Sequence, residues 1–161
     1  MYNGVETMAL LELVFLAVIA FLWMEIFSYV AHRYVYHGFL WTIHRSHHTA
    51  RTGPFELNDL FPVFLSLATM GLLLYALVPP VDHRLLAVTI GITAYGATYL
   101  FLHDFYVHRR LKLLGLRIPF LATLKKAHAI HHRDGGEPYG LLLFPRLEDL
   151  KRVQVKDEDP V

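Results

Sequence analysis

The chain has 161 residues, a length typical of one domain, and its formal net charge is +1. Its hydrophobic fraction of 55% and mean hydropathy of +0.37 exceed the values usual for soluble domains, which are about 45–50% apolar. It contains no cysteine, which excludes disulfides, thiolate zinc sites, iron–sulfur clusters and a cysteine nucleophile. We expect no nucleic-acid partner.

Three apolar runs, at residues 8–27, 60–78 and 85–102, are long enough to cross a bilayer, which takes about 20 helical residues. Glu6 precedes the first run and no Lys or Arg does, so we interpret this run as a retained span rather than a cleaved signal peptide. A fourth apolar stretch at 118–124 is too short to span and is expected to be interfacial or re-entrant. The sequence therefore predicts one all-α domain over residues 1–161, with three to four membrane-embedded helices.

Ten of the eleven histidines form four short clusters, spaced HxxxxH, HxxHH, HxxxxH and HxxHH. The second half of the chain thus repeats the spacing of the first. Neutral imidazole is the commonest metal ligand, so all ten are candidate ligands. They are His32, His37, His44, His47, His48, His103, His108, His128, His131 and His132. His83 lies apart and is expected to bind no metal.

The order of the spans places all four clusters on one side of the membrane. The first two clusters follow the first span, and the hairpin of the second and third spans returns the chain to that side. Fourteen of the fifteen Lys and Arg residues lie on the same side, and only Arg84 lies opposite. By the positive-inside rule, we predict a multi-pass protein of the cell (inner) membrane with a histidine-rich cap on its cytoplasmic face.

The spacing within the clusters bears on how many metals they hold. Residues at i, i+3 and i+4 share one face of an α-helix, so each HxxHH triplet can offer two or three imidazoles to one point. The HxxxxH pairs are spaced i, i+5, and their side chains would diverge by about 140° on an ideal α-helix. Such a pair would meet one centre only from a helix end, or would serve two centres. Two pairs and two triplets favour a dinuclear site.

Imidazole suits zinc, copper, iron and nickel. Zinc hydrolases usually use three protein ligands, and the chain has no HExxH motif. A bis-histidine haem site remains possible in a helical membrane bundle. A pair of non-haem irons that activates dioxygen fits best, with no catalytic side chain beyond the metal centre.

These residues are similar to a known family. The four histidine boxes resemble the membrane fatty acid hydroxylase/sterol desaturase superfamily, and the runs that flank them resemble its bacterial β-carotene hydroxylases. These runs are Met-Glu-Ile-Phe at 24–27, His-Gly at 37–38, His-Arg-Ser-His-His at 44–48, Glu-Leu-Asn-Asp-Leu-Phe at 56–61, the third box at 103–109, and Gly-Gly and Tyr-Gly at 135–136 and 139–140. In the third box, Phe105 and Tyr106 stand where that family usually has Gly-Leu.

The resemblance implies a diiron monooxygenase that hydroxylates carbon 3 of the β-ionone ring, converting β-carotene to β-cryptoxanthin and then to zeaxanthin. It further implies O2 as cosubstrate, and electrons from a separate ferredoxin or NAD(P)H-dependent reductase. A hydroxylase or desaturase of another lipid, such as an acyl chain or a sterol, stays an alternative. A haem-binding membrane electron carrier is a further one.

Other side chains are candidates for supporting roles. Glu25 lies seven residues before His32, on the same face of a helix, and is expected to orient a ligating imidazole, although it would pair elsewhere in the bundle if its role were structural. Acidic and amide groups beside the boxes share this expectation: Asn58, Asp59 and Asp104. Helix capping is the alternative, and for Asp104 an ion pair with Arg109 is another. Aromatic residues near the third box are expected to line a substrate channel, with an interfacial belt as the alternative: Phe105, Tyr106 and Tyr99.

Overall fold

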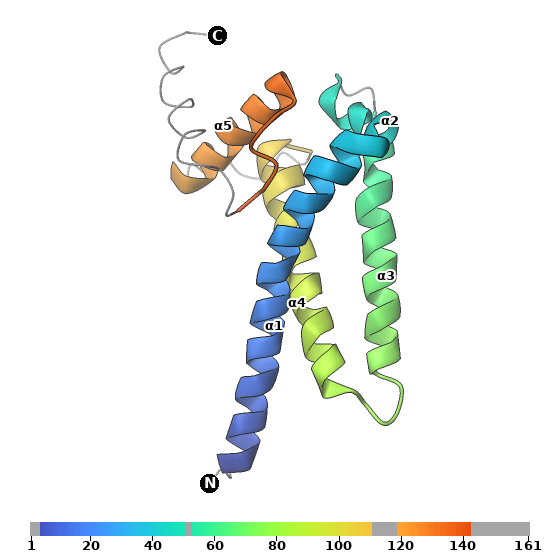
Figure 1. The fold of residues 1–161 in the computed structure, drawn as a ribbon, viewed down its shortest axis with the longest axis vertical. Coiled ribbons are helices and arrows are strands. Elements are labelled where there is room, and N and C mark those ends of the chain that lie inside the picture. Colours follow the sequence, from blue (N-terminus) through green and yellow to red (C-terminus); the bar gives the residue numbers. More distant parts are fainter. Residues whose placement is uncertain (1–3, 51–52, 111–118, 143–161) are drawn as a thin grey trace. The chain divides into compact units, whose positions relative to one another are not determined.

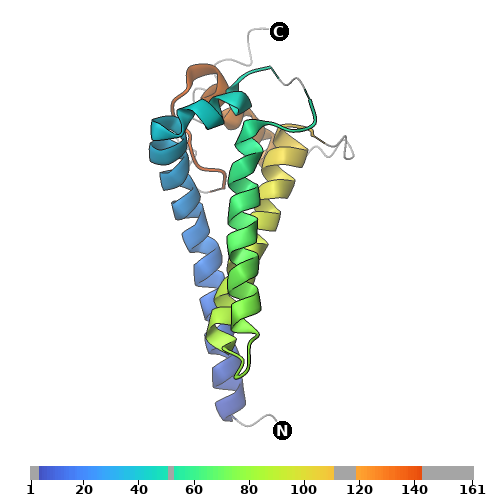
Figure 2. The ribbon, with the colours of Figure 1, turned by 90° about the vertical axis from the view of Figure 1, so that its right-hand side faces the viewer.

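The computed structural model of the chain describes residues 4–50, 53–110 and 119–142, which contain helices and loops and no strand. These residues form two compact units (Figures 1 and 2). The first comprises the chain up to Met24 together with Asp59–Thr98, and the second comprises Glu25–Asn58 together with the part that begins at Tyr99. The prediction of one domain over residues 1–161 stays a prediction.

The first unit is built from regular α-helices: the larger part of α1 (Gly4–Val30), α3 (Leu60–Ala76) and α4 (His83–Tyr99). Most of its large apolar side chains are exposed, as in Phe64 and Leu67. Three helical stretches are long and apolar enough to cross a membrane, and they cover Ala9–Phe39, Leu57–Ala76 and His83–Val107. The predicted all-helical membrane fold with three spans is therefore confirmed.

The hairpin between α3 and α4 ends at Asp82 (Figure 2). The Asp82 carboxylate accepts hydrogen bonds from the backbone N–H groups of Arg84 and Leu85, at 3.1 and 3.0 Å, and so caps the first turn of α4. Asp59 stands at the corresponding position before α3, but its side chain makes no capping hydrogen bond there. The capping role that the sequence allowed for Asp59 is thus not seen at the start of α3.

Helices α1 and α4 pack closely at a glycine. A Cβ atom built on Gly91 would lie 2.2 Å from the backbone oxygen of Ala17, so only glycine fits there. Near this contact, the rings of Phe21 and Tyr95 meet edge to face at 5.6 Å, and Tyr95 is buried. The guanidinium of Arg84 pairs with the carboxylate of Glu12 at 2.8 Å.

The second unit contains less regular helices. Two π-helical segments, η1 (Ala31–Phe39) and η4 (Leu100–Val107), continue α1 and α4 respectively, and a kink at Gly38 ends the helical geometry of η1. A short α2 (Trp41–His44) and a 3-10 turn η2 (Arg45–His48) follow η1, and a further turn η3 covers Leu57–Asp59. Helix α2 packs on η1, and α5 (Pro119–Asp134) packs on η4. The stretch predicted at 118–124 becomes the start of α5 from residue 119, and residue 118 lies outside the described residues.

Candidate metal centre

All ten clustered histidines lie in the second unit, where nine of them form two groups. In each group, one ring nitrogen from every member lies within 4.8 Å of the others. Cluster A consists of His32, His37, His44, His48 and His131, and cluster B consists of His47, His103, His108 and His128. The tenth ring, His132, is stacked on His48 at 4.3 Å and lies 4.5 Å from the His128 ring.

The two clusters share the histidine boxes in a reciprocal way. Each cluster takes both members of one HxxxxH box and the first member of the HxxHH box that follows it. The middle member of each HxxHH box crosses to the other cluster: His47 to cluster B and His131 to cluster A. The repeat in the sequence is therefore present in space, because each half of the chain contributes to both clusters.

The π-helical segments explain why the HxxxxH pairs converge. In a π-helix the backbone hydrogen bond runs from i+5 to i, and at η4 it joins the His108 N–H to the His103 carbonyl at 2.9 Å. Side chains at i and i+5 consequently share a face. The rings of His32 and His37 lie 5.1 Å apart and those of His103 and His108 lie 4.6 Å apart. The expected divergence of about 140° is wrong, because it assumed α-helical geometry at both boxes.

Three imidazoles of cluster A are held by neutral oxygens. The Nδ1 atom of His32 donates to the backbone carbonyl of Tyr139 at 2.8 Å, and that of His131 donates to the carbonyl of Gly136 at 2.5 Å. The Nδ1 atom of His44 donates to the side-chain Oδ1 of Asn58 at 2.7 Å. Each bond fixes the tautomer and makes Nε2 the ring nitrogen that carries the lone pair.

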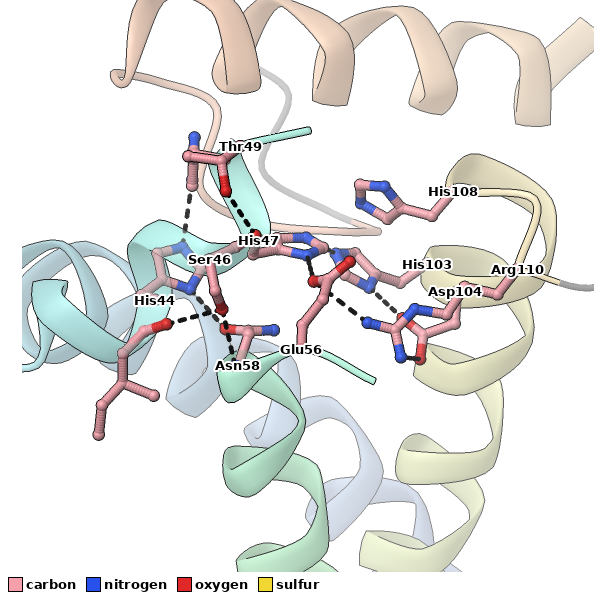
Figure 3. Close-up of polar contacts among 12 residues, drawn as sticks. His44, Ser46, His47, Thr49, Glu56, Asn58, His103, Asp104, His108 and Arg110 are labelled. Carbon is pink, nitrogen blue, oxygen red and sulfur yellow. Dashed lines mark hydrogen bonds and ion pairs between the residues drawn. The ribbon is translucent and has the colours of Figure 1, made fainter. Parts of the chain in front are cut away.

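Two imidazoles of cluster B are held by carboxylates. The Nδ1 atom of His47 donates to Glu56 at 3.1 Å, and that of His103 donates to Asp104 at 2.7 Å. Figure 3 shows Arg110 between these two acids, 3.3 Å from the Glu56 carboxylate and 3.8 Å from that of Asp104. Sequence reasoning gave Glu56 no role, although it begins the 56–61 run that carries the family resemblance.

The ring nitrogens that face each other test whether the residues fit a metal. The Nε2 atoms of His32 and His44 lie 3.0 Å apart, and those of His47 and His103 lie 3.2 Å apart. All four rings donate through Nδ1, so these Nε2 atoms present lone pairs to each other. Two imidazole ligands of one metal, each about 2.0–2.1 Å from it, would stand about 3 Å apart at a right angle. The spacing therefore fits two nitrogens that share a cation.

A buried polar atom without a partner supports this fit. The Nε2 atom of His132 is buried and has no hydrogen-bond partner in the described part of the chain. Burial of a polar atom without a hydrogen bond costs free energy, and a metal ion would offset that cost. The His132 ring contacts both clusters, because its centroid lies 4.3 Å from that of His48 and 4.6 Å from that of His47.

Burial keeps the ligands outside the spans neutral at pH 7. It lowers the pKa of His44 and of His131 from 6.5 to about 4, with further lowering by neighbouring imidazoles. The same two causes, burial first and His48 second, lower the pKa of His132 to about 2. Burial also lowers the pKa values of His47, His48 and His128. These imidazoles are therefore in the neutral form that can bind a metal.

The Glu25 carboxylate contacts the backbone of the segment that also supplies a partner of His32. It is fully buried and accepts the backbone N–H groups of Leu141 and Leu142, at 2.9 and 2.8 Å. It thereby holds the segment that carries the Tyr139 carbonyl, which in turn bonds His32. The expectation that Glu25 orients an imidazole stays a prediction, and the contacts described here give it an indirect route through the backbone.

The remaining predicted residues are divided between the two units, with Asp59 and His83 in the first and the three aromatic residues in the second. Tyr99 stacks on the His103 ring at 4.7 Å, and Phe105 and Tyr106 are half-buried in η4. Their role in a substrate channel stays a prediction, as does a supporting role of Asp59. His83, which was expected to bind no metal, is exposed at the start of α4 and belongs to neither cluster.

The chain is similar in sequence to a known protein family and to several of its members. The model of the fatty acid hydroxylase family matches residues 17–148. The chain is 40% identical over 143 residues to β-carotene 3-hydroxylase 1, chloroplastic, of Arabidopsis thaliana, covering 84% of this chain and 44% of the relative. It is 37% identical over 144 residues to the β-carotene hydroxylase of Pantoea ananas, covering 86% of this chain and 79% of the relative. The chain spans about half the length of the plant relatives it matches. No solved structure matches it.

Proposed function

The chain belongs to the fatty acid hydroxylase family, and we propose that it is a non-haem diiron monooxygenase that hydroxylates carbon 3 of the β-ionone ring of carotenoids. The products would be β-cryptoxanthin and then zeaxanthin from β-carotene, with O2 and two electrons consumed at each hydroxylation. The observation that carries the proposal is the pair of imidazole clusters, each built from three of the four histidine boxes. The carotenoid substrate is supported by the names of the relatives.

We assign the ten clustered histidines as the ligands of two irons. When bound, the irons supply the redox chemistry that activates dioxygen and cleaves an unactivated C–H bond, which amino-acid side chains cannot do. The protein holds the imidazoles in one tautomer through Tyr139, Gly136, Asn58, Glu56 and Asp104. Asn58 and Asp104 are thus assigned the supporting roles that the sequence suggested.

The membrane spans suit an apolar substrate. A carotenoid would reach the centre from within the bilayer, and we assign Tyr99, Phe105 and Tyr106 to the path of its ring because they lie on η4 or at its start. The excess of Lys and Arg on the histidine side supports a cytoplasmic position for the centre in a cell (inner) membrane. We expect a separate ferredoxin or NAD(P)H-dependent reductase to donate the electrons.

Coexpression tests the reaction. In bacterial cells that produce β-carotene, the chain should yield β-cryptoxanthin and zeaxanthin, and the purified protein should hold two irons. A His128→Ala variant, which removes a buried member of cluster B, should leave β-carotene unchanged. Unchanged β-carotene with the unmodified, iron-loaded chain would contradict the proposal.

The same cells distinguish the alternatives. A new hydroxyl group or double bond on an acyl chain or sterol, found by lipid profiling, would replace the carotenoid as substrate. A Soret band in the purified protein would show that the histidines bind haem and not a diiron centre.

A further inference from the structure

The two clusters differ in the charge that stands behind their imidazoles. In cluster A, His32, His44 and His131 donate to two backbone carbonyls and one side-chain amide, all of them neutral. In cluster B, His47 and His103 donate to carboxylates. The candidate ligands of both clusters are imidazoles, five in cluster A and four in cluster B, so the chemical difference lies in these hydrogen-bond partners.

Two acids and one guanidinium gather behind two imidazoles of cluster B. Glu56 and Asp104 contribute two negative charges, and Arg110 contributes one positive charge that both acids share. The side chains of these three residues are only 11–14% exposed, so water screens them weakly. Arg110 also constrains the orientation of both carboxylates, because its guanidinium contacts one oxygen of each (Figure 3). Two carboxylates, bridged by one guanidinium, therefore stand directly behind His47 and His103.

Acids beside cluster A are engaged with other donors. Glu25 accepts the backbone N–H groups of Leu141 and Leu142. Glu137 accepts the Tyr29 hydroxyl at 2.7 Å and pairs with Arg33 at 2.6 Å, so its charge is balanced by a guanidinium. These contacts position the segment that supplies the two carbonyl oxygens, and they leave cluster A with neutral hydrogen-bond acceptors at three of its rings.

We propose that cluster B binds its metal more tightly than cluster A, because Glu56 and Asp104 act as positioning residues that increase the electron donation of His47 and His103. A carboxylate behind a ligating imidazole raises its basicity, and removal of such a partner typically lowers metal affinity by about 10–100-fold. This inference rests on the dinuclear centre of the proposed function. It adds that the two metal positions are unequal, with cluster B better suited to the more highly charged metal.

Release of a redox-inert metal tests the inequality. The purified full chain is loaded with two Zn2+ and mixed with an excess of a chromophoric chelator, and zinc release is followed in time. We expect two phases of one zinc each, separated by about tenfold or more in rate. His37→Ala, in cluster A, should remove the fast phase, and His108→Ala, in cluster B, should remove the slow one.

Isosteric variants separate charge from geometry. Glu56→Gln and Asp104→Asn keep an oxygen that accepts the Nδ1–H bond but remove the negative charge, so each should accelerate the slow phase by about 10–100-fold and leave the fast phase unchanged. Asn58→Asp introduces a carboxylate behind His44 and should slow the fast phase. A purely structural role of Glu56 and Asp104 would not produce these opposite changes.

Each outcome decides the inference. A single release phase, or a slow phase that neither Glu56→Gln nor Asp104→Asn changes, would overturn it. If Glu56→Gln or Asp104→Asn binds zinc at cluster A but can no longer be loaded with zinc at cluster B, cluster B has been weakened and the inference is supported. If such a variant loses both zinc ions, the inference is overturned. Zinc release is measured without turnover, so a chain that fails to hydroxylate β-carotene but releases zinc in these two phases would refute the proposed reaction alone.

Discussion

The two units of the molecule are stabilised in different ways. In the first unit, regular α-helices expose apolar side chains such as Phe64 and Leu67, 71% and 68% exposed, which a bilayer can cover. In the second unit, Glu25 and His131 are fully buried, and both are held by specific hydrogen bonds. The first unit therefore needs apolar character at most positions, whereas the second needs a particular side chain with a particular partner.

Loss of one ligand should give the largest effect. His47 crosses from the second histidine box to cluster B, and its ring contacts those of His103, His108 and His132. We expect His47→Ala to lower hydroxylation by more than about 100-fold and to remove one iron per chain, because even partners of a ligand are worth about 10–100-fold. Product analysis and metal analysis measure both effects. His83→Ala, in the first unit, is the matched control and should retain both irons. Equal losses in the two variants would show that the units do not differ in this way.

Removal of a buried carboxylate that accepts backbone N–H groups should come next. Glu25→Leu leaves the N–H groups of Leu141 and Leu142 without the carboxylate that accepts them, at a cost of about 1–3 kcal/mol for each. The Tyr139 carbonyl that bonds His32 would then be less well placed, so we expect about tenfold weaker binding of the metal at cluster A. Zinc titration measures this change. Glu6→Leu, at an exposed position of α1, is the control and should bind zinc normally.

Acid should weaken the metal-free second unit more than the first. His44 and His131 have folded pKa values of about 4 against a model value of 6.5, so the unfolded chain binds more protons than the folded one between these values. The stabilisation from these neutral rings is fully present above about pH 6.5 and decreases as the pH falls toward 4. Fluorescence of Trp41, which lies 5.3 Å from the His48 ring, reports on the second unit, and Trp23 reports on the first.

Single-tryptophan variants distinguish the two reporters. We expect the midpoint of denaturant unfolding followed at Trp41 to fall from pH 7.5 to pH 5, while the midpoint followed at Trp23 falls less. A midpoint at Trp41 that does not change across this range would contradict the assignment of neutral, buried imidazoles.

The sequence predicted the first unit well and the second unit only in part. Hydropathy located the spans because apolar length is a local property. The division of the histidines could not be predicted, because the i, i+5 pairs converge only on a π-helix and nothing in the spacing distinguishes it from an α-helix. The carbonyls of Gly136 and Tyr139 were also missed, since a backbone oxygen has no residue type to mark it.

The smallest expected effect is a difference in stability between alanine substitutions at two glycines of the same helix in the first unit. A Cβ on Gly91 would meet the backbone oxygen of Ala17 at 2.2 Å, whereas a Cβ on Gly96 meets nothing within 4 Å. Because backbone cannot move aside as a side chain can, Gly91→Ala should destabilise the unit by about 1–3 kcal/mol. Gly96→Ala should be neutral or stabilising by up to about 1 kcal/mol, since alanine favours helix. Thermal unfolding in detergent measures both. Neither variant should change zinc release from the second unit if the stability of the first depends on apolar packing alone, and altered release in Gly91→Ala would show that the centre depends on that packing.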